Sequence, residues 1–190
     1  MTDRPPTARV ARGESVEVAH PADRADAFRR LAEGHLDKGY RLARAILGEP
    51  ADAEDAVHDA YILAWRQWST LRDPSRFERW FDRILINTCR NRLRRRGRLR
   101  IEDISTELQL AEPGDRYSDA NDREEVGRAL AHLDPDHRIV VALRFFADLT
   151  VDDIAARVGV PAGTVKSRLH VALRRLHAAL GLPGEPEVSS

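Results

Sequence analysis

The chain reads Thr150-Val-Asp-Asp-Ile-Ala-Ala-Arg-Val-Gly-Val-Pro-Ala-Gly-Thr-Val-Lys-Ser-Arg-Leu-His170, and this stretch predicts two short helices joined at a tight corner. Thr150 can cap the first helix, and Asp153 can complete a capping box and oppose the positive helix end. Gly159 can adopt the left-handed conformation that ends this helix, while Pro161 suits the first turn of the next one. The pattern is that of a helix-turn-helix.

The second helix of this pair has one apolar face, and its other faces are rich in hydrogen-bond donors. The apolar positions are Val165, Leu169, Ala172, Leu173, Leu176 and Leu180. The outward positions are Thr164, Lys166, Ser167, Arg168, His170, Arg174 and Arg175. Such side chains read base edges and phosphates in DNA. A basic helix face can also be an ordinary solvated surface, but no Asp or Glu occurs from Ile154 to Gly184, and this one-sided charge favours DNA binding.

Charge is segregated along a chain whose total is neutral, with 31 basic and 31 acidic residues. Residues 49–59 contain five acidic residues and no Lys or Arg, whereas residues 90–100 contain seven arginines and no acidic residue. A neutral total argues against a uniformly basic nucleic-acid binder. The segregation predicts at least two partners of opposite charge.

Neither an enzyme nor a disulfide-stabilised fold is expected from this composition. Cys89 is the single cysteine, which indicates a reducing compartment and a buried apolar role for this residue. The seven histidines show no metal-ligand spacing, and we find no phosphate-binding glycine loop and no Ser-His-Asp set. We expect no catalytic residue, metal or cofactor. Without a signal peptide or a transmembrane run, we expect a cytoplasmic protein with no membrane insertion.

The periodicity predicts an all-α chain made of two small helical domains. Residues 1–22 are expected to be a disordered leader, residues 23–97 a first domain, residues 98–122 a flexible acidic linker, residues 123–180 the helix-turn-helix domain and residues 181–190 a tail. The linker contains Glu102, Asp103, Glu107, Glu112, Asp115 and Asp119. We expect the third helix of the first domain to stop near Gly97.

Apolar spacing also predicts which residues form the core of each helix. In the first domain the expected core positions are Phe28, Leu31, Leu36, Tyr40, Ala43 and Leu47, then Ala53, Ala56, Val57, Ala60, Tyr61 and Ala64, then Phe77, Trp80, Phe81, Ile84, Leu85 and Thr88. In the second domain they are Val126, Leu130, Leu133, Ile139, Val140, Leu143 and Phe146. An Asp-Pro turn at 71–75 separates the second helix from the third.

Three segments, in this order, resemble the extracytoplasmic-function (group IV) sigma factors of the bacterial sigma-70 family. Residues 52–65 are similar to the helix that docks on core RNA polymerase, residues 77–87 with the following arginines to the promoter −10 helix, and residues 150–170 to the −35 helix. The third segment alone also resembles response-regulator activators. The resemblance covers residues 25–180 and implies a two-domain sigma fold.

The resemblance implies a role for each set of residues. Contact with the coiled-coil clamp of the polymerase β′ subunit is implied for Asp52, Asp55, His58, Asp59 and Trp65. Contact with the −10 element is implied for Arg72, Asp73, Ser75, Phe77, Asn87, Arg90, Asn91 and Arg94, the first four around a flipped base. Contact with the −35 element is implied for the outward residues of the last helix. The family often has Asp at the place of Asn91, which leaves the −10 preference open.

The function implied is that of an alternative-sigma transcription initiation factor without chemistry of its own. Its expected partners are core RNA polymerase (β′ clamp and β flap), promoter DNA and an anti-sigma factor. The acidic linker is either a solubilising spacer or a segment that threads polymerase channels. The alternative function is a stand-alone helix-turn-helix transcription regulator, but such a protein does not need the second DNA-facing surface at residues 71–96.

Overall fold

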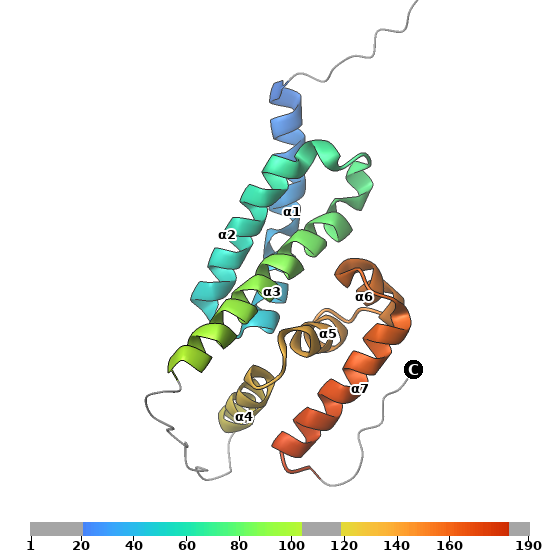
Figure 1. The fold of residues 1–190 in the computed structure, drawn as a ribbon. Helices are drawn as coiled ribbons and strands as arrows, with labels where there is room; N and C mark the ends of the chain where they lie inside the picture. The colour runs from blue at the N-terminus through green and yellow to red at the C-terminus, as the bar shows by residue number, and fades with distance from the viewer. Residues whose placement is uncertain (1–20, 104–118, 183–190) are drawn as a thin grey trace, which may run out of the picture.

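Helices make up nearly all of the structure, a computed structural model that describes residues 21–103 and 119–182 (Figure 1). The α-helices are α1 (Pro21–Leu47), α2 (Pro50–Gln67), α3 (Phe77–Asp103), α4 (Asp119–Ala131), α5 (Pro135–Phe145), α6 (Val151–Val158) and α7 (Ala162–Ala179). Two single turns of 3-10 helix, Trp68–Thr70 and Pro74–Arg76, lie between α2 and α3. These described ranges contain no strand, which confirms the predicted all-α class. The predicted leader, most of the linker and most of the tail lie outside the described residues.

Small residues let α2 pack closely against α1 and α3. Ala53, Ala56, Ala60 and Ala64 are each fully buried, as the spacing predicts. Their small size leaves room for aromatic rings from the neighbouring helices, and the ring of Tyr61 stacks on that of Phe81 with centroids 4.4 Å apart. Burial of these apolar surfaces holds the three helices together.

The third helix is longer than the sequence predicts. We expected it to stop near Gly97, but α3 continues as an α-helix to Asp103, inside the predicted linker. A glycine in a helix costs only about 1 kcal/mol relative to alanine, and the arginines and leucine around it favour the helical state. The predicted stop at Gly97 is therefore wrong.

The helix-turn-helix forms as its sequence predicts. The Thr150 Oγ1 accepts a hydrogen bond from the backbone N–H of Asp153 at 3.2 Å and donates one to the Asp153 carboxylate at 2.8 Å. Gly159 ends α6 in the left-handed conformation, with φ 74° and ψ 35°. Pro161 stands just before α7 rather than inside its first turn.

Three residues predicted to be in the core are largely exposed: Leu36 (48%), Val126 (39%) and Phe146 (61%). Leu36 lies one position beyond the buried stripe of α1, because the residues that actually face α3 are His35 and Gly39. Phe146 follows the last turn of α5, so the periodicity of that helix no longer sets its direction.

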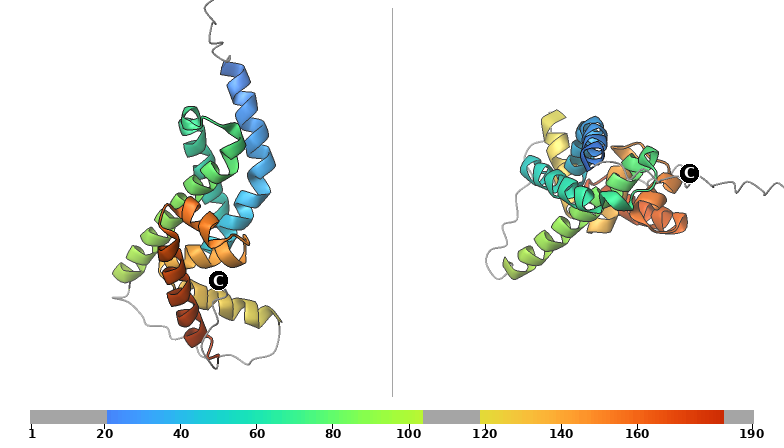
Figure 2. Two further views of the ribbon diagram at one scale, coloured as in Figure 1. Left: turned by 90° about the vertical axis from the view of Figure 1, so that its right-hand side faces the viewer. Right: turned by 90° about the horizontal axis from the view of Figure 1, so that it is seen from above.

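The helices of the two predicted domains pack directly on each other (Figures 1 and 2). Helices α5 and α6 lie against α3, and α5 also lies against α1. Buried residues of both domains belong to one continuous apolar cluster. Helical periodicity did not predict this packing, because it identifies a buried face and not the helix that covers it.

The burial of Cys89 generates a test of the core. Its side chain is fully buried, and burial raises the pKa of the thiol to about 12. Because the thiolate is the reactive form, the native protein at pH 8 is expected to react with a disulfide reagent such as DTNB far more slowly than a free thiol does. Absorbance of the released thiol measures the rate, and the same protein in guanidinium chloride should react at once. Rapid reaction without denaturant would contradict this placement of Cys89.

Candidate nucleic-acid and protein interfaces

The outer face of α7 presents the predicted donor residues to solvent. Lys166, Ser167, His170, Arg174 and Arg175 are exposed. Thr164 and Arg168 are half-buried. Beneath them Val165, Leu169 and Ala172 are buried and fix the rotation of α7 against α5 and α6. The apolar face therefore orients the donor face.

Two arginines of α7 are paired with carboxylates at the start of α5. Arg175 binds Asp134, and the hydrogen bond from Arg175 is the main reason that the pKa of Asp134 lies below its usual value. The Arg168 Nη2 lies 3.4 Å from the Asp136 Oδ2. Lys166, Ser167 and His170 make no side-chain hydrogen bond or ion pair within the described ranges.

The turn before α3 is ordered by Asp73. Its carboxylate accepts hydrogen bonds from the backbone N–H of Ser75 at 3.0 Å and from the Ser75 Oγ at 2.7 Å. These two bonds lower the pKa of Asp73 and keep it ionised. Arg72, Asp73 and Ser75 are all exposed at this turn.

Phe77, by contrast, is part of the core. Only 3% of its surface is exposed, and its ring lies among those of Phe28, Trp68, Trp80 and Phe81. The expectation that Phe77 contacts a flipped base does not agree with this burial. The aromatic rings around Phe77 explain why an apolar aromatic residue stands at this position of the sequence.

The four −10 candidates on α3 do not share one free face. Arg90 donates to Asp136 at 2.8 Å and also to the side-chain oxygen of Asn87, while Arg94 lies 3.5 Å from the same Asp136 carboxylate. Asn87 and Asn91 are exposed. The structure thus brings Arg90 and Arg94 together with Arg168 of α7 around one carboxylate.

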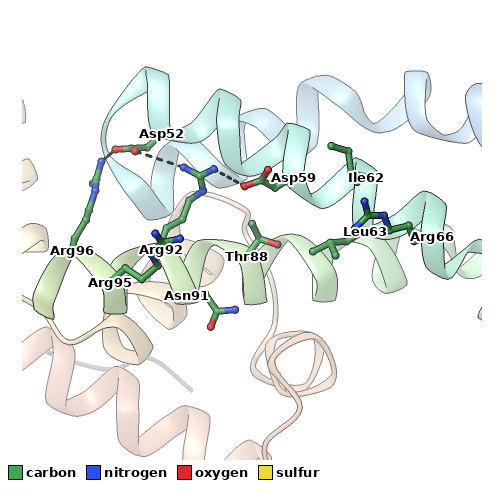
Figure 3. Close-up of a pocket in the computed structure, with 10 residues that line it drawn as sticks. All are labelled: Asp52, Asp59, Ile62, Leu63, Arg66, Thr88, Asn91, Arg92, Arg95 and Arg96. Carbon is green, nitrogen blue, oxygen red and sulfur yellow. Dashed lines mark hydrogen bonds and ion pairs between the residues drawn. The ribbon is translucent and has the colours of Figure 1, made fainter. Parts of the chain in front are cut away.

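Three acidic side chains of α2, those of Asp52, Asp55 and Asp59, pair with arginines of α3 (Figure 3). The Arg92 guanidinium binds Asp59 and lies 3.4 Å from the Asp55 carboxylate, and Arg96 binds Asp52. Arg92 and Arg96 therefore face α2. The arginine run of residues 90–100 is divided between two surfaces.

An apolar strip that the sequence analysis missed runs beside these acids. Ile62 and Leu63 are 39% and 37% exposed and line a groove of about 620 Å³ between α2 and α3 (Figure 3). Trp65, 49% exposed, lies about one turn further on. Its ring packs edge-on against that of Phe28, with ring centroids 5.2 Å apart. The spacing of the alanines in α2 could have predicted this strip, because Ile62 and Leu63 do not lie on the helix face that the buried alanines form.

The described residues contain no group of three or more His, Cys, Asp or Glu side chains that could hold a metal ion. Among the helices in the same ranges, none is both long and apolar enough to span a membrane.

Comparison with known proteins identifies both halves of the chain. Residues 31–99 match the family described as Sigma-70 region 2, and residues 129–178 match Sigma-70, region 4. The chain is 32% identical over 154 residues to the RNA polymerase sigma-E factor of Streptomyces coelicolor, covering 80% of this chain and 85% of that relative. It is 33% identical over 151 residues to the ECF RNA polymerase sigma factor SigE of Mycolicibacterium smegmatis, of whose length it spans 58%.

Solved structures show the same helical fold. The structure of CnrH in complex with the cytosolic domain of CnrY matches with a TM-score of 0.57 and 25% identity over 83% of this chain and 94% of that chain. The sigma factor RpoE of Bartonella quintana, solved with the anti-sigma factor NepR, matches with a TM-score of 0.56 and 24% identity over 86% of this chain and 97% of that chain.

The chain belongs to the sigma-70 family, whose members bind core RNA polymerase and promoter DNA and are not enzymes. Within that family it is an extracytoplasmic-function sigma factor, an alternative sigma factor that directs the polymerase to promoters. Because region 2 is present beside the helix-turn-helix, the alternative of a stand-alone regulator is set aside.

The position of Phe77 in the core generates a stability test. Phe77→Ala is expected to lower the free energy of unfolding by about 3–5 kcal/mol, because it leaves a cavity among the surrounding rings. The exposed Arg72→Ala should change that free energy by less than about 0.5 kcal/mol. Chemical denaturation followed by circular dichroism measures both. Equal, small effects would show that Phe77 is not packed in the core.

Proposed function

We propose that the recognition surfaces of this sigma factor are the outer face of α7 for the −35 duplex and the 71–76 turn with α3 for the −10 element. The observation that carries this proposal is the exposed donor face of α7, held outward by buried Val165 and Leu169. An exposed row of donors on the second helix of a helix-turn-helix suits the major groove.

The −10 element is assigned to Arg72, Asp73 and Ser75 of the turn and to Asn87, Arg90, Asn91 and Arg94 of α3. The turn is exposed and ordered by Asp73, so it can hold an extruded base without reorganising. Phe77 supports the turn from the core and does not contact DNA in this proposal.

The polymerase-binding surface is assigned to α2. The carboxylates of Asp52, Asp55 and Asp59, which pair with Arg92 and Arg96 within the chain, supply negative charge that a basic partner can share. His58 supplies an exposed hydrogen-bonding ring, and Trp65 with the exposed Ile62 and Leu63 supplies apolar area. Apolar area in a polar rim is the usual composition of a protein interface, and the charges orient the partner. The proposed partner is the coiled-coil clamp of the β′ subunit.

The proposal includes two further partners. Phe145 and Phe146, 59% and 61% exposed, form an apolar end of α5 suited to the β flap. An anti-sigma factor is proposed as regulator, because one structural neighbour is a sigma factor in complex with the anti-sigma factor NepR, and another is CnrH in complex with the cytosolic domain of CnrY. The proposed location, for a protein acting on the polymerase, is the cytoplasm.

Sequence reading by α7 can be tested with Arg168→Ala in the complete holoenzyme. An arginine bidentate to guanine discriminates by about 1–3 kcal/mol, so affinity for a cognate −35 duplex should fall about 5- to 150-fold while affinity for random duplex changes little. Fluorescence anisotropy measures both. Arg174→Ala is the control: as a phosphate contact it should weaken both duplexes equally and reduce the salt slope by about 1. If Arg168→Ala lowers the affinity for the cognate and the random duplex equally, Arg168 is also a phosphate contact and does not read sequence.

The α2 surface can be tested with Leu63→Asp. A charge at the centre of an apolar contact should lower the affinity for core polymerase at least about tenfold, without changing the thermal unfolding midpoint, because Leu63 is exposed in the free protein. Glu54→Gln, an exposed change on the same helix, is the matched control. Biolayer interferometry measures binding, and run-off transcription on a promoter library measures function. Unchanged binding by Leu63→Asp would remove α2 from the interface.

A further inference from the structure

Helix α5 carries one of the two buried arginines among the described residues. These are Arg138, 7% exposed, and Arg157, 6% exposed. Arg157 has a carboxylate partner, since its Nε donates to the Asp82 Oδ2 at 2.8 Å. Arg138 makes no ion pair or side-chain hydrogen bond with any described residue, and its buried Nε has no hydrogen-bond partner. Because a buried charge is costly unless it is paired, Arg138 lacks a counter-charge that Arg157 has.

The guanidinium group of Arg138 lies at the C-terminal end of α1. A Cβ atom at Gly48, which follows α1 with φ 85°, would lie 2.8 Å from the Arg138 Nη2, so a residue with a side chain there would collide with it. A helix C-terminus carries only about half a negative charge. Arg96 shares this end, since its Nη1 donates to the Leu47 carbonyl oxygen at 3.4 Å. The end of α1 therefore supplies less than the full counter-charge that Arg138 lacks.

Positive charge gathers in the pocket that Arg138 lines. The pocket has a volume of about 1100 Å³ and is bounded by the end of α1, the turn that leads to α2, and helices α4 and α5. Its charged lining consists of Arg41, Arg44, Glu49, Arg96, Arg128 and Arg138. Arg96 also binds Asp52. When Glu49 and Asp52 are set against the five arginines, three positive charges remain among these residues.

The charges of this pocket act on one another. Burial lowers the pKa of Arg138, and the positive charge of Arg96 lowers it further, while the carboxylate of Glu49 acts in the opposite direction. Arg41 and Arg44 are exposed on α1 and form no ion pair with a described residue. An anion among these arginines would offset their repulsion and supply the missing counter-charge.

The rest of the pocket lining is largely apolar. Leu47 and Leu130 are buried in its wall, whereas Val126 and Phe146 are 39% and 61% exposed. Tyr40, half-buried, adds a second aromatic ring. Aromatic and aliphatic side chains at a pocket pack against the flat, apolar part of a ligand, and aromatic rings stack on bases. The pocket therefore combines cationic groups with surface for a ring system.

This lining favours a small phosphorylated ligand over a nucleic-acid strand. Guanidinium groups bind phosphate oxygens through paired N–H donors, and several guanidinium groups suit a chain of phosphates. The backbone phosphates of a duplex cannot reach the buried Arg138, whereas a terminal phosphate group is small enough to enter the pocket. None of the residues assigned above to the −10 or the −35 element lines this pocket.

We propose that this pocket binds a nucleoside polyphosphate, with Arg41, Arg44 and Arg138 on the phosphates and Tyr40 and Val126 against the base. The proposal does not depend on the assignment of the DNA-binding surfaces, because it uses none of their residues. The ligand binds the folded chain and not the unfolded chain, so it raises the thermal unfolding midpoint in proportion to its affinity and concentration.

Isothermal titration calorimetry of the full chain with ATP, in the presence of EDTA, tests the site. ATP should bind saturably at one site, pyrophosphate more weakly because it has no base, and adenosine not measurably because it has no phosphate. A short single-stranded DNA at the same phosphate concentration should not displace ATP. Absence of saturable ATP binding would overturn the proposal, and displacement by the DNA would make the pocket a nucleic-acid contact instead.

Two exposed arginines of α1 form a matched pair of variants. Arg44→Gln removes a charge from the pocket and should lower the affinity for ATP about 10- to 150-fold, the loss expected for a charge-assisted hydrogen bond. Arg30→Gln removes the same charge about 21 Å away along α1, beyond the Debye length of about 8 Å at physiological salt, and should change the affinity less than about twofold. Equal losses would show that ATP responds to overall charge and not to this pocket.

Arg138→Met separates ligand binding from a structural role of Arg138. An apolar side chain of similar length removes the unpaired buried charge, so the thermal unfolding midpoint without ATP should stay the same or rise, while the affinity for ATP falls at least about tenfold. Circular dichroism measures the midpoint and calorimetry the affinity. A lower midpoint with unchanged ATP affinity would show that Arg138 only holds the end of α1, and the proposed site would be wrong.

Discussion

The buried pair of Asp82 and Arg157 is the interaction on which the arrangement of the two regions depends. It joins residues 75 positions apart in the sequence, and His35 from a third helix completes the hydrogen bonding of the carboxylate. Removing one partner of such a pair leaves an uncompensated buried charge, at a cost of about 3–5 kcal/mol. The pair therefore contributes little net stability but strongly selects one geometry. Any other register of α6 on α3 would bury Arg157 or Asp82 without its partner.

Helix α3 contacts the core, α2 and α5 at once, and the positions of its arginines follow from these contacts. Phe77, Phe81 and Leu85 face the core, Arg92 and Arg96 face the acids of α2, and Arg90 and Arg94 face Asp136 of α5. Four arginines of the run therefore form two sets of ion pairs on opposite sides of one helix. An arginine cluster that looks like a single basic patch in the sequence is thus partly paired with carboxylates within the folded chain, while the exposed Arg95 has no ion pair among the described residues. DNA binding then requires exchange of carboxylate partners for phosphates.

Local features were predictable from the sequence, and long-range ones were not. The Thr150 cap, the Gly159 corner and the alanine face of α2 depend on neighbours within one or two turns, so their spacing predicts them. The buried stripe of α1 was misplaced because His35 and Gly39 occupy positions where an apolar residue is expected. Helix continuation through Gly97 depends on a balance of about 1 kcal/mol. The direction of Arg90 and Arg92 depends on partners 46 and 33 residues away, which periodicity does not contain.

The single carboxylate at Asp136 also bears on where the free protein spends its time in a cell. A genome offers about 10⁶–10⁹ non-specific sites, and exposed arginines would distribute the protein among them by counterion release. Asp136 supplies one negative charge to Arg90, Arg94 and Arg168, so this cluster keeps a net positive charge, and Lys166 and Arg174 are exposed on α7. The free protein is therefore expected to divide its time between solution and chromosomal DNA, in a proportion that the salt concentration sets.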